Sequence, residues 1–124
     1  MASEITQTVQ MRALVNASEW KVDRTNTAES IRANSTPHKA GQAITASGVA
    51  IALGSVTPPF KFYGRNLNGS GLVATFRTDS GAASLVAIWS GSPDCLFTVA
   101  SGVSALYGIS TAGTVEIEYT AVPL

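Results

Sequence analysis

The chain has 124 residues, a formal net charge of zero and a single cysteine. This is the usual length of one domain, and it is enough to bury a core without help from disulfides or a metal. The basic side chains are scattered among acidic ones and form no clustered surface that could bind phosphates, so we expect no nucleic-acid partner. These side chains are Arg12, Lys21, Arg24, Arg32, Lys39, Lys61, Arg65 and Arg77.

Low charge is the most unusual feature of the composition. Only 13% of the residues are charged and the mean hydropathy is +0.21. Such a chain has little like-charge repulsion to keep copies apart, so we expect part of its surface to be covered in an assembly. The alternative is that small side chains such as Ala, Ser and Gly raise the hydropathy without forming an apolar patch.

No segment predicts export or a membrane span. The most apolar run, from Ala43 to Leu53, is interrupted by polar residues and is far shorter than the roughly 20 residues of a spanning helix. The first residues include Glu4 where a secretory signal would have a basic region. We therefore expect a protein made in a cytoplasm, and a lone thiol fits a reducing compartment.

Strands are predicted along the whole chain because apolar and polar residues alternate with a period of two and no long segment has helical spacing. The alternation begins in the segment from Ser3 to Val15 and is clearest in the closing segment from Thr114 to Ala121. Between them we expect strands near 19–23, 30–34, 42–46, 49–53, 60–66, 72–77, 84–89, 96–100 and 105–109. The region from Ala28 to Gly41 is polar and could instead be a long loop.

Short strands separated by Gly, Pro, Asn and Asp turns are typical of all-β domains. We predict one domain over residues 1–124, an antiparallel β-sandwich of jelly-roll-like type or a closed barrel. The strands from Val49 to Leu53 and from Leu85 to Trp89 are apolar on both faces. Each is therefore covered on both sides within the chain, or meets another subunit with its outer face.

Residues 1–15 have two interpretations. Ile5, Val9 and Met11 lie in one apolar row of a long strand that starts at the N-terminal end of the sequence. The row could belong to the core of the sandwich as an ordinary first strand. It could also be an assembly arm that pairs with an exposed strand edge of a neighbouring molecule.

The sequence lacks residues in the patterns that catalysis or metal binding needs. His38 stands alone beside a proline, and Cys95 has no neighbouring base, so we expect an exposed loop histidine and a buried structural thiol. Glu116 and Glu118 share the polar face of a strand, where a solvated surface explains them better than a pair of catalytic acids. We predict no enzyme, no cofactor and no metal site.

The aromatic segment after Pro58-Pro59 is the candidate binding surface. Phe62 and Tyr63 are neighbours on one strand and must face opposite sides of it, so at least one aromatic side chain leaves the core. The candidate surface for a partner or a glycan consists of Phe60, Phe62, Tyr63, Arg65, Asn66 and Asn68.

A resemblance to a known family rests on three parts of the chain. The central segment from Ile44 to Asn66, with its apolar strand, Leu-Gly turn and Thr-Pro step into an aromatic strand ending in Arg-Asn, resembles small β-sandwich virion proteins of tailed phages. The opening Glu4-Ile-Thr and the closing Thr114-Val-Glu-Ile-Glu-Tyr are also similar to that family's ends. Such proteins occur as capsid decoration or cement subunits, as tail and baseplate parts, and as fibre tips.

The resemblance implies a virion structural protein made in the bacterial cytoplasm, and most readily a decoration or cement subunit. Its expected partners are the major capsid protein or other virion proteins and further copies of itself, with a homotrimer favoured. The alternative is a receptor- or carbohydrate-binding module of a phage tail or fibre.

Overall fold

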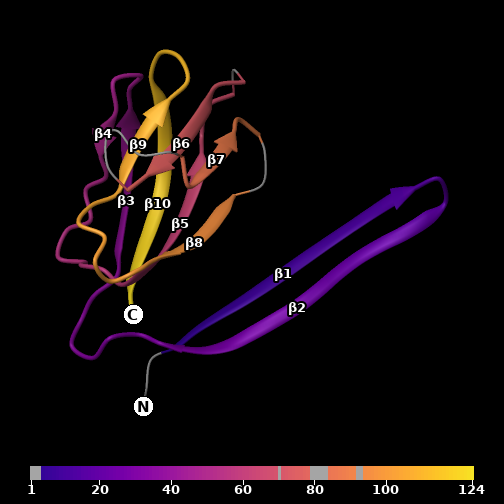
Figure 1. Cartoon of the computed structure of the whole chain (residues 1–124), viewed down its shortest axis with the longest axis horizontal. Coiled ribbons are helices and arrows are strands. Elements are labelled where there is room, and N and C mark those ends of the chain that lie inside the picture. The colour runs from indigo at the N-terminus through magenta and orange to yellow at the C-terminus, as the bar shows by residue number, and fades with distance from the viewer. Residues whose placement is uncertain (1–3, 70, 79–83, 92–93) are drawn as a thin grey trace. The chain divides into compact units, whose positions relative to one another are not determined.

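The computed structural model describes residues 4–69, 71–78, 84–91 and 94–124. Within these residues the chain is all β, with no helix (Figure 1). The strands are β1 (Glu4–Val15), β2 (Ser18–Ser30), β3 (His38–Ile44), β4 (Val49–Ala50), β5 (Phe60–Asn66), β6 (Val73–Arg77), β7 (Val86–Trp89), β8 (Cys95–Val99), β9 (Tyr107–Ser110) and β10 (Val115–Pro123).

The chain divides into two compact units at Ala33. The first contains β1 and β2, which pair with each other in a two-stranded sheet, here called the hairpin. The second unit, Asn34–Leu124, contains the other eight strands and is here called the sandwich.

Two four-stranded sheets form the sandwich, with strand orders β3-β10-β5-β8 and β4-β9-β6-β7. The antiparallel pairs are nested along the sequence: β6 pairs with β7, β5 with β8, β4 with β9, and β3 with β10. An antiparallel ribbon folded over in this way, with β10 also beside β5 and β9 beside β6, is a jelly roll. The predicted sandwich of jelly-roll type is therefore confirmed, and the sheets stay open instead of closing into one barrel.

The core lies between the two sheets and is built by the side chains that alternate inward. Phe62 on β5 is fully buried, and its ring centroid lies 5.1 Å from those of Phe76 and Phe97 and 5.6 Å from that of Tyr119. Such ring pairs add about 0.5–1.5 kcal/mol each beyond the burial of their area. The core cluster and the apolar side chains packed against it all come from residue 40 onwards, so the sandwich has a complete core of its own.

Several predicted strands differ from the structure. The strand predicted over 19–23 is part of the longer β2, and the strand predicted over 42–46 begins earlier, at His38. No strand covers 30–34: β2 continues to Ser30, and residues 31–37 are irregular. The predicted strand over 49–53 is reduced to Val49–Ala50, because the backbone amide of Ala52 donates to the side chain of Gln42 at 3.0 Å instead of to another strand. The same Gln42 amide donates to the carbonyl oxygen of Ala50 at 2.8 Å and so fixes this segment beside β3.

The apolar strand β7 is an edge strand of its sheet, and its outer face is open. Val86 and Ile88 turn inward, whereas Trp89 is 61% exposed and Leu85, just before the strand, is also exposed. Within the residues that the structure describes, the outward side chains of this apolar run are therefore not covered in the way that the inward ones are.

Candidate functional site

The hairpin forms because a tight turn joins two strands with matching alternation. Asn16 and Ala17 link β1 to β2 and both have positive φ, 50° and 65°, as a two-residue type I′ turn requires. The register then runs from Val15 opposite Ser18 to Glu4 opposite Ser30, with one irregularity between Ile5 and Gln7. Asn tolerates the left-handed conformation well, whereas Ala17 adopts it at a cost of about 1 kcal/mol.

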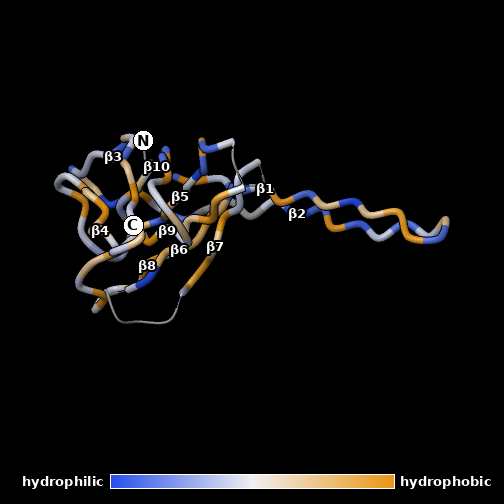
Figure 2. Tube along the Cα trace, turned by 90° about the horizontal axis from the view of Figure 1, so that it is seen from above, coloured by the Kyte–Doolittle hydropathy of each residue, from blue (hydrophilic) through white to orange (hydrophobic). Residues whose placement is uncertain are grey.

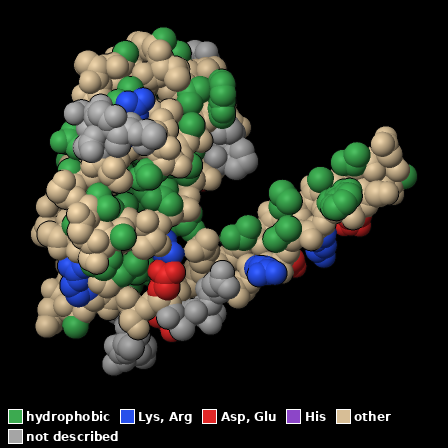
Figure 3. All heavy atoms as spheres, in the orientation of Figure 1, with side chains coloured by type: hydrophobic (Ala, Val, Ile, Leu, Met, Phe, Trp, Pro, Cys, Tyr) green, Lys and Arg blue, Asp and Glu red, His purple; other side chains and the backbone are tan. Residues whose placement is uncertain are grey.

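This register gives the hairpin two different faces, because residues directly opposite each other share a face. Met11 lies opposite Val22, and Ala13 opposite Trp20. Hydropathy alternates along both strands (Figure 2), and hydrophobic side chains gather along one side of the hairpin (Figure 3). The face that we call apolar consists of Val9, Met11, Ala13, Val15, Trp20 and Val22, and it ends at the charged Arg24, which lies opposite Val9.

The apolar face is exposed to water. Trp20 is 64% exposed and Met11 56%, and no side chain that the structure describes on β1 or β2 is buried. None of these residues belongs to the hydrophobic core cluster. Contiguous apolar surface of this kind on a soluble protein marks an interaction site.

The opposite, polar face carries charges of both signs. Arg12 Nε lies 2.9 Å from Glu19 Oε1, and the Thr8 and Thr25 hydroxyls lie 3.4 Å apart. Both interactions are exposed, so each contributes at most about 1 kcal/mol. These two interactions therefore add only a little to the pairing of β1 with β2.

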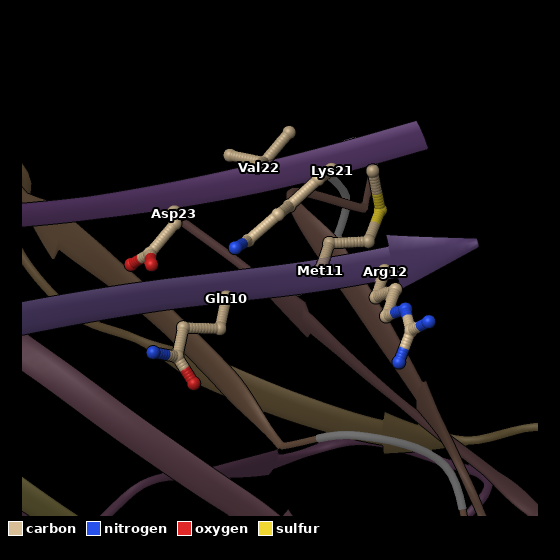
Figure 4. Close-up of a pocket in the computed structure, with 6 residues that line it drawn as sticks. All are labelled: Gln10, Met11, Arg12, Lys21, Val22 and Asp23. Atoms are coloured by element: carbon tan, nitrogen blue, oxygen red, sulfur yellow. The ribbon is translucent and has the colours of Figure 1, made fainter. Parts of the chain in front are cut away.

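Figure 4 shows the residues that line a hollow in the middle of the hairpin. It is lined by Gln10, Met11, Arg12, Lys21, Val22 and Asp23. Met11 and Val22 belong to the apolar face, and the four others to the polar face. The hollow is therefore lined by side chains from both faces of the hairpin.

The structure places the three residues predicted for an assembly interface on one side of the hairpin. Ile5, Val9 and Met11 alternate along β1, with Ile5 half-buried next to the irregularity and the other two exposed. The sequence prediction missed Trp20 and Val22, which complete the same face from β2. Their alternation with Glu19, Lys21 and Asp23 after a two-residue connection was the signal that could have found them.

Half of the predicted partner or glycan surface is interior, and Asn68 is half-buried in the loop after β5. Phe60, Phe62 and Asn66 are buried, because they are the inward-facing residues of β5. The Asn66 amide donates to the carbonyl oxygen of Leu72 at 2.9 Å and its Oδ1 accepts from the backbone of Asn68 at 2.9 Å, so it organises the loop after β5.

Two residues of that predicted surface face outward. Tyr63 and Arg65 lie on the outer side of β5, opposite Thr120 and Glu118 of β10. The Tyr63 hydroxyl donates to the carboxylate of Asp94, and this hydrogen bond raises the pKa of Tyr63 to about 12. The pair joins β5 to the start of β8 and leaves a small polar surface in place of the expected aromatic one.

The Cys95 thiol is buried against Gly64, as predicted. The prediction of an exposed loop histidine was wrong: His38 is the first residue of β3 and is half-buried, because its ring lies 6.1 Å from the Tyr119 ring. In the part of the chain that the structure describes, no three His, Cys, Asp or Glu side chains come close enough to hold a metal ion. No helix in that part is long and apolar enough to cross a membrane.

Comparison with protein-family models, curated proteins and solved structures finds no match. The hairpin's apolar face is therefore the strongest candidate site on structural grounds alone. Other large hydrophobic side chains are also exposed: Leu85 and Trp89 beside and on β7, and Leu96 on β8 of the other sheet.

The buried thiol leads to a prediction about reactivity. Burial raises the pKa of Cys95 to about 11, so at pH 8 almost all of it is the unreactive thiol. We expect Ellman's reagent to react with Cys95 at least about a hundredfold faster in 8 M urea than in the native protein. The pKa of Cys95 in the folded protein lies above the ordinary value of 9.0. The contribution of this thiol to the free energy of unfolding is therefore fully present below pH 9 and is lost as the pH rises towards 11. Equal rates in native and unfolded protein would contradict the burial.

Proposed function

We propose that this protein is a structural subunit of a phage particle, most readily a capsid decoration or cement subunit, and that the hairpin is its assembly element. The observation that carries the proposal is the exposed apolar face of the hairpin, because the sandwich completes its core without it. A surface that is dispensable for the fold and costly to leave in water has its use in association.

Three further features support this proposal. The sandwich is a jelly roll, an architecture that occurs in viral capsid and lectin domains among others, although a fold alone does not define a function. The chain is poor in charge. The similarity of the segment Ile44–Asn66 to small virion proteins of tailed phages agrees with both.

As a decoration subunit, the protein would bridge neighbouring capsid proteins as a homo-oligomer, with a trimer favoured. Covering apolar surface at such contacts stabilises a shell by roughly 25 cal/mol per Å² before the cost of ordering the subunits. The receptor- or carbohydrate-binding alternative is less favoured, because Phe60, Phe62 and Asn66 of its candidate surface are buried.

The copy number in particles tests the proposal. An antibody against the purified chain is used to probe phage particles banded from the source organism on a density gradient, and gel densitometry then measures copies per particle. A decoration subunit is expected at hundreds of copies, in numbers that follow the capsid lattice. A handful of copies at a tail tip would favour the adhesin, and absence from particles would refute a virion role.

A further inference from the structure

The hairpin has two outer edges at which a further strand could pair. The sheet that the structure describes here consists of β1 and β2, with no third strand beside either of them. A two-stranded ribbon is at best marginally stable in water, and a third strand with a covered apolar face stabilises it. A long open edge is also a template for another chain, unless charged side chains, proline or bulges protect it.

The register shows which backbone groups point towards these edges. In a ladder closed by a two-residue turn, the pair that flanks the turn points its N–H and C=O groups at each other, and the pairs then alternate. Val15 and Ser18 are the flanking pair here. Every second pair after them therefore directs its backbone groups outward. The outward residues are Thr8, Gln10, Arg12 and Leu14 on β1, and Glu19, Lys21, Asp23 and Thr25 on β2.

Charge distinguishes the two edges. Glu19, Lys21 and Asp23 place alternating charges along the edge of β2, and charged side chains are a common protection of an edge. Among the four outward residues of β1 only Arg12 is charged, and its Nε already lies 2.9 Å from Glu19 Oε1. Over residues 7–15, all of which the structure describes, the register is regular and the sequence has no proline. The edge of β1 is therefore the open one.

We propose that the edge of β1 binds an extended segment of a different protein, which adds to the hairpin as a third strand. The inference deepens the proposed function, on which it rests for the role of the hairpin in assembly. It names the contact by which the hairpin holds a capsid protein or another virion protein. The segment has apolar residues at every second position, because these then continue the row of Val9, Met11 and Ala13 on the same side of the sheet.

The apolar face is too small to hold a partner by itself. At about 3.3 Å per residue, the stretch from Val9 to Val15 is roughly 23 Å long, and two strands about 5 Å apart make a ribbon roughly 10 Å wide. Its area is on the order of 230 Å², against roughly 800 Å² per partner in a stable specific interface. Main-chain hydrogen bonds along the edge of β1 supply affinity that this face cannot.

A different protein fits this edge better than a second copy of the chain. If two copies paired through their β1 edges, the two hairpins would form one sheet with both apolar faces on the same side. Such pairing would join two exposed faces and cover neither. A partner whose strand belongs to a larger sheet also covers the face, because the hairpin then extends that sheet beside the layer packed on it.

Matched proline variants of the full chain test which edge is used. Proline removes a backbone N–H and is tolerated at an edge position whose N–H faces solvent. Gln10→Pro blocks the edge of β1, and Asp23→Pro, at the residue directly opposite, blocks the edge of β2 in the same way. Thr8→Pro and Thr25→Pro repeat the comparison at another opposite pair, without a change of charge.

Two probes are used: phage particles of the same source produced without this chain, and a short labelled peptide of alternating valine and threonine with lysine at its ends. Sedimentation measures binding to the particles, and fluorescence anisotropy measures binding to the peptide. The parent chain and the two β2 variants are expected to bind both probes. Gln10→Pro and Thr8→Pro are expected to bind at least about tenfold more weakly, because a backbone group of the added strand loses its partner.

Amide hydrogen exchange of the parent chain with the peptide gives a second measurement that needs no substitution. Pairing at the edge of β1 protects the amides that point outward from that strand, while those of β2 keep their exchange rates. We expect exchange to slow at least about tenfold on β1 only. The amides to compare are those of Thr8, Gln10, Arg12 and Leu14 with those of Glu19, Lys21, Asp23 and Thr25.

Binding by Gln10→Pro at the parental affinity would overturn the inference, and so would protection of the β2 amides in place of those of β1. Self-association of the parent chain that Gln10→Pro abolishes would assign the edge to a second copy and overturn the choice of partner. The proposed function fails separately: a parent chain that binds the peptide by β1 but does not bind the particles keeps the inference and refutes the virion role. Particle binding that all four variants retain does the reverse.

Discussion

Replacing Phe62 by alanine is expected to lower the free energy of unfolding by about 3–5 kcal/mol. Phe62 is fully buried at the centre of the sandwich, where its ring contacts Phe76, Phe97 and Tyr119. Its removal leaves a cavity between two sheets whose strands are fixed by their hydrogen bonds, so the core cannot collapse around it. Since small domains are stable by only about 5–15 kcal/mol, much of the fold's stability depends on this one ring.

Urea unfolding followed by circular dichroism measures the loss, and the neighbouring residue supplies the control. Tyr63→Phe lies one position further along β5, on the outer face, and removes only the exposed hydrogen bond to Asp94. We expect it to cost no more than about 1 kcal/mol. Similar losses for the two variants would show that β5 does not have the inward and outward faces described here.

Removal of the hairpin is expected to leave the sandwich folded and to abolish assembly. A chain of residues 34–124 keeps every residue of the core cluster and all eight strands of the jelly roll. We expect it to be soluble, with a melting temperature within a few degrees of that of the full chain and no oligomer at micromolar concentration. Thermal unfolding and light scattering on the same samples measure both properties.

Two outcomes would contradict this prediction. An insoluble or unfolded 34–124 fragment would mean that the hairpin contributes to the stability of the sandwich. A folded fragment that still assembles would move the interface to the sandwich, where Leu85 and Trp89 are exposed at the edge strand β7. Loss of assembly in a Trp89→Ser variant of the fragment would then identify that edge as the interface.

Local alternation predicted most of the strands of the sandwich. The strands β5 and β10 lie within two residues of their predicted bounds, because the period of two reports which side chains face a core wherever one face is buried. The same rule correctly predicted that Phe62 and Tyr63 face opposite sides of β5. It failed at Ala52, whose backbone amide donates to the side chain of Gln42. The residues around Ala52 do not indicate a partner ten positions away.

The candidate site was only half predictable for a related reason. Ile5, Val9 and Met11 stand out as an apolar row, yet such a row looks the same in sequence whether it packs on its own core or stays exposed. The turn at Asn16-Ala17 lacks the glycine that usually marks a two-residue hairpin, so the pairing of β1 with β2 was not foreseen. Without that pairing, Trp20 and Val22 could not be assigned to the same face.

The amino-acid sequence by itself determined the all-β class and which side chains of most strands face inward, because both follow from the alternation of neighbouring residues. The tertiary structure decided which strands pair, and therefore that β3 to β10 nest into a jelly roll while β1 and β2 form a sheet of their own. Strand pairing depends on contacts between residues far apart in the chain, and those contacts also decide whether an apolar row becomes core or remains a surface for assembly.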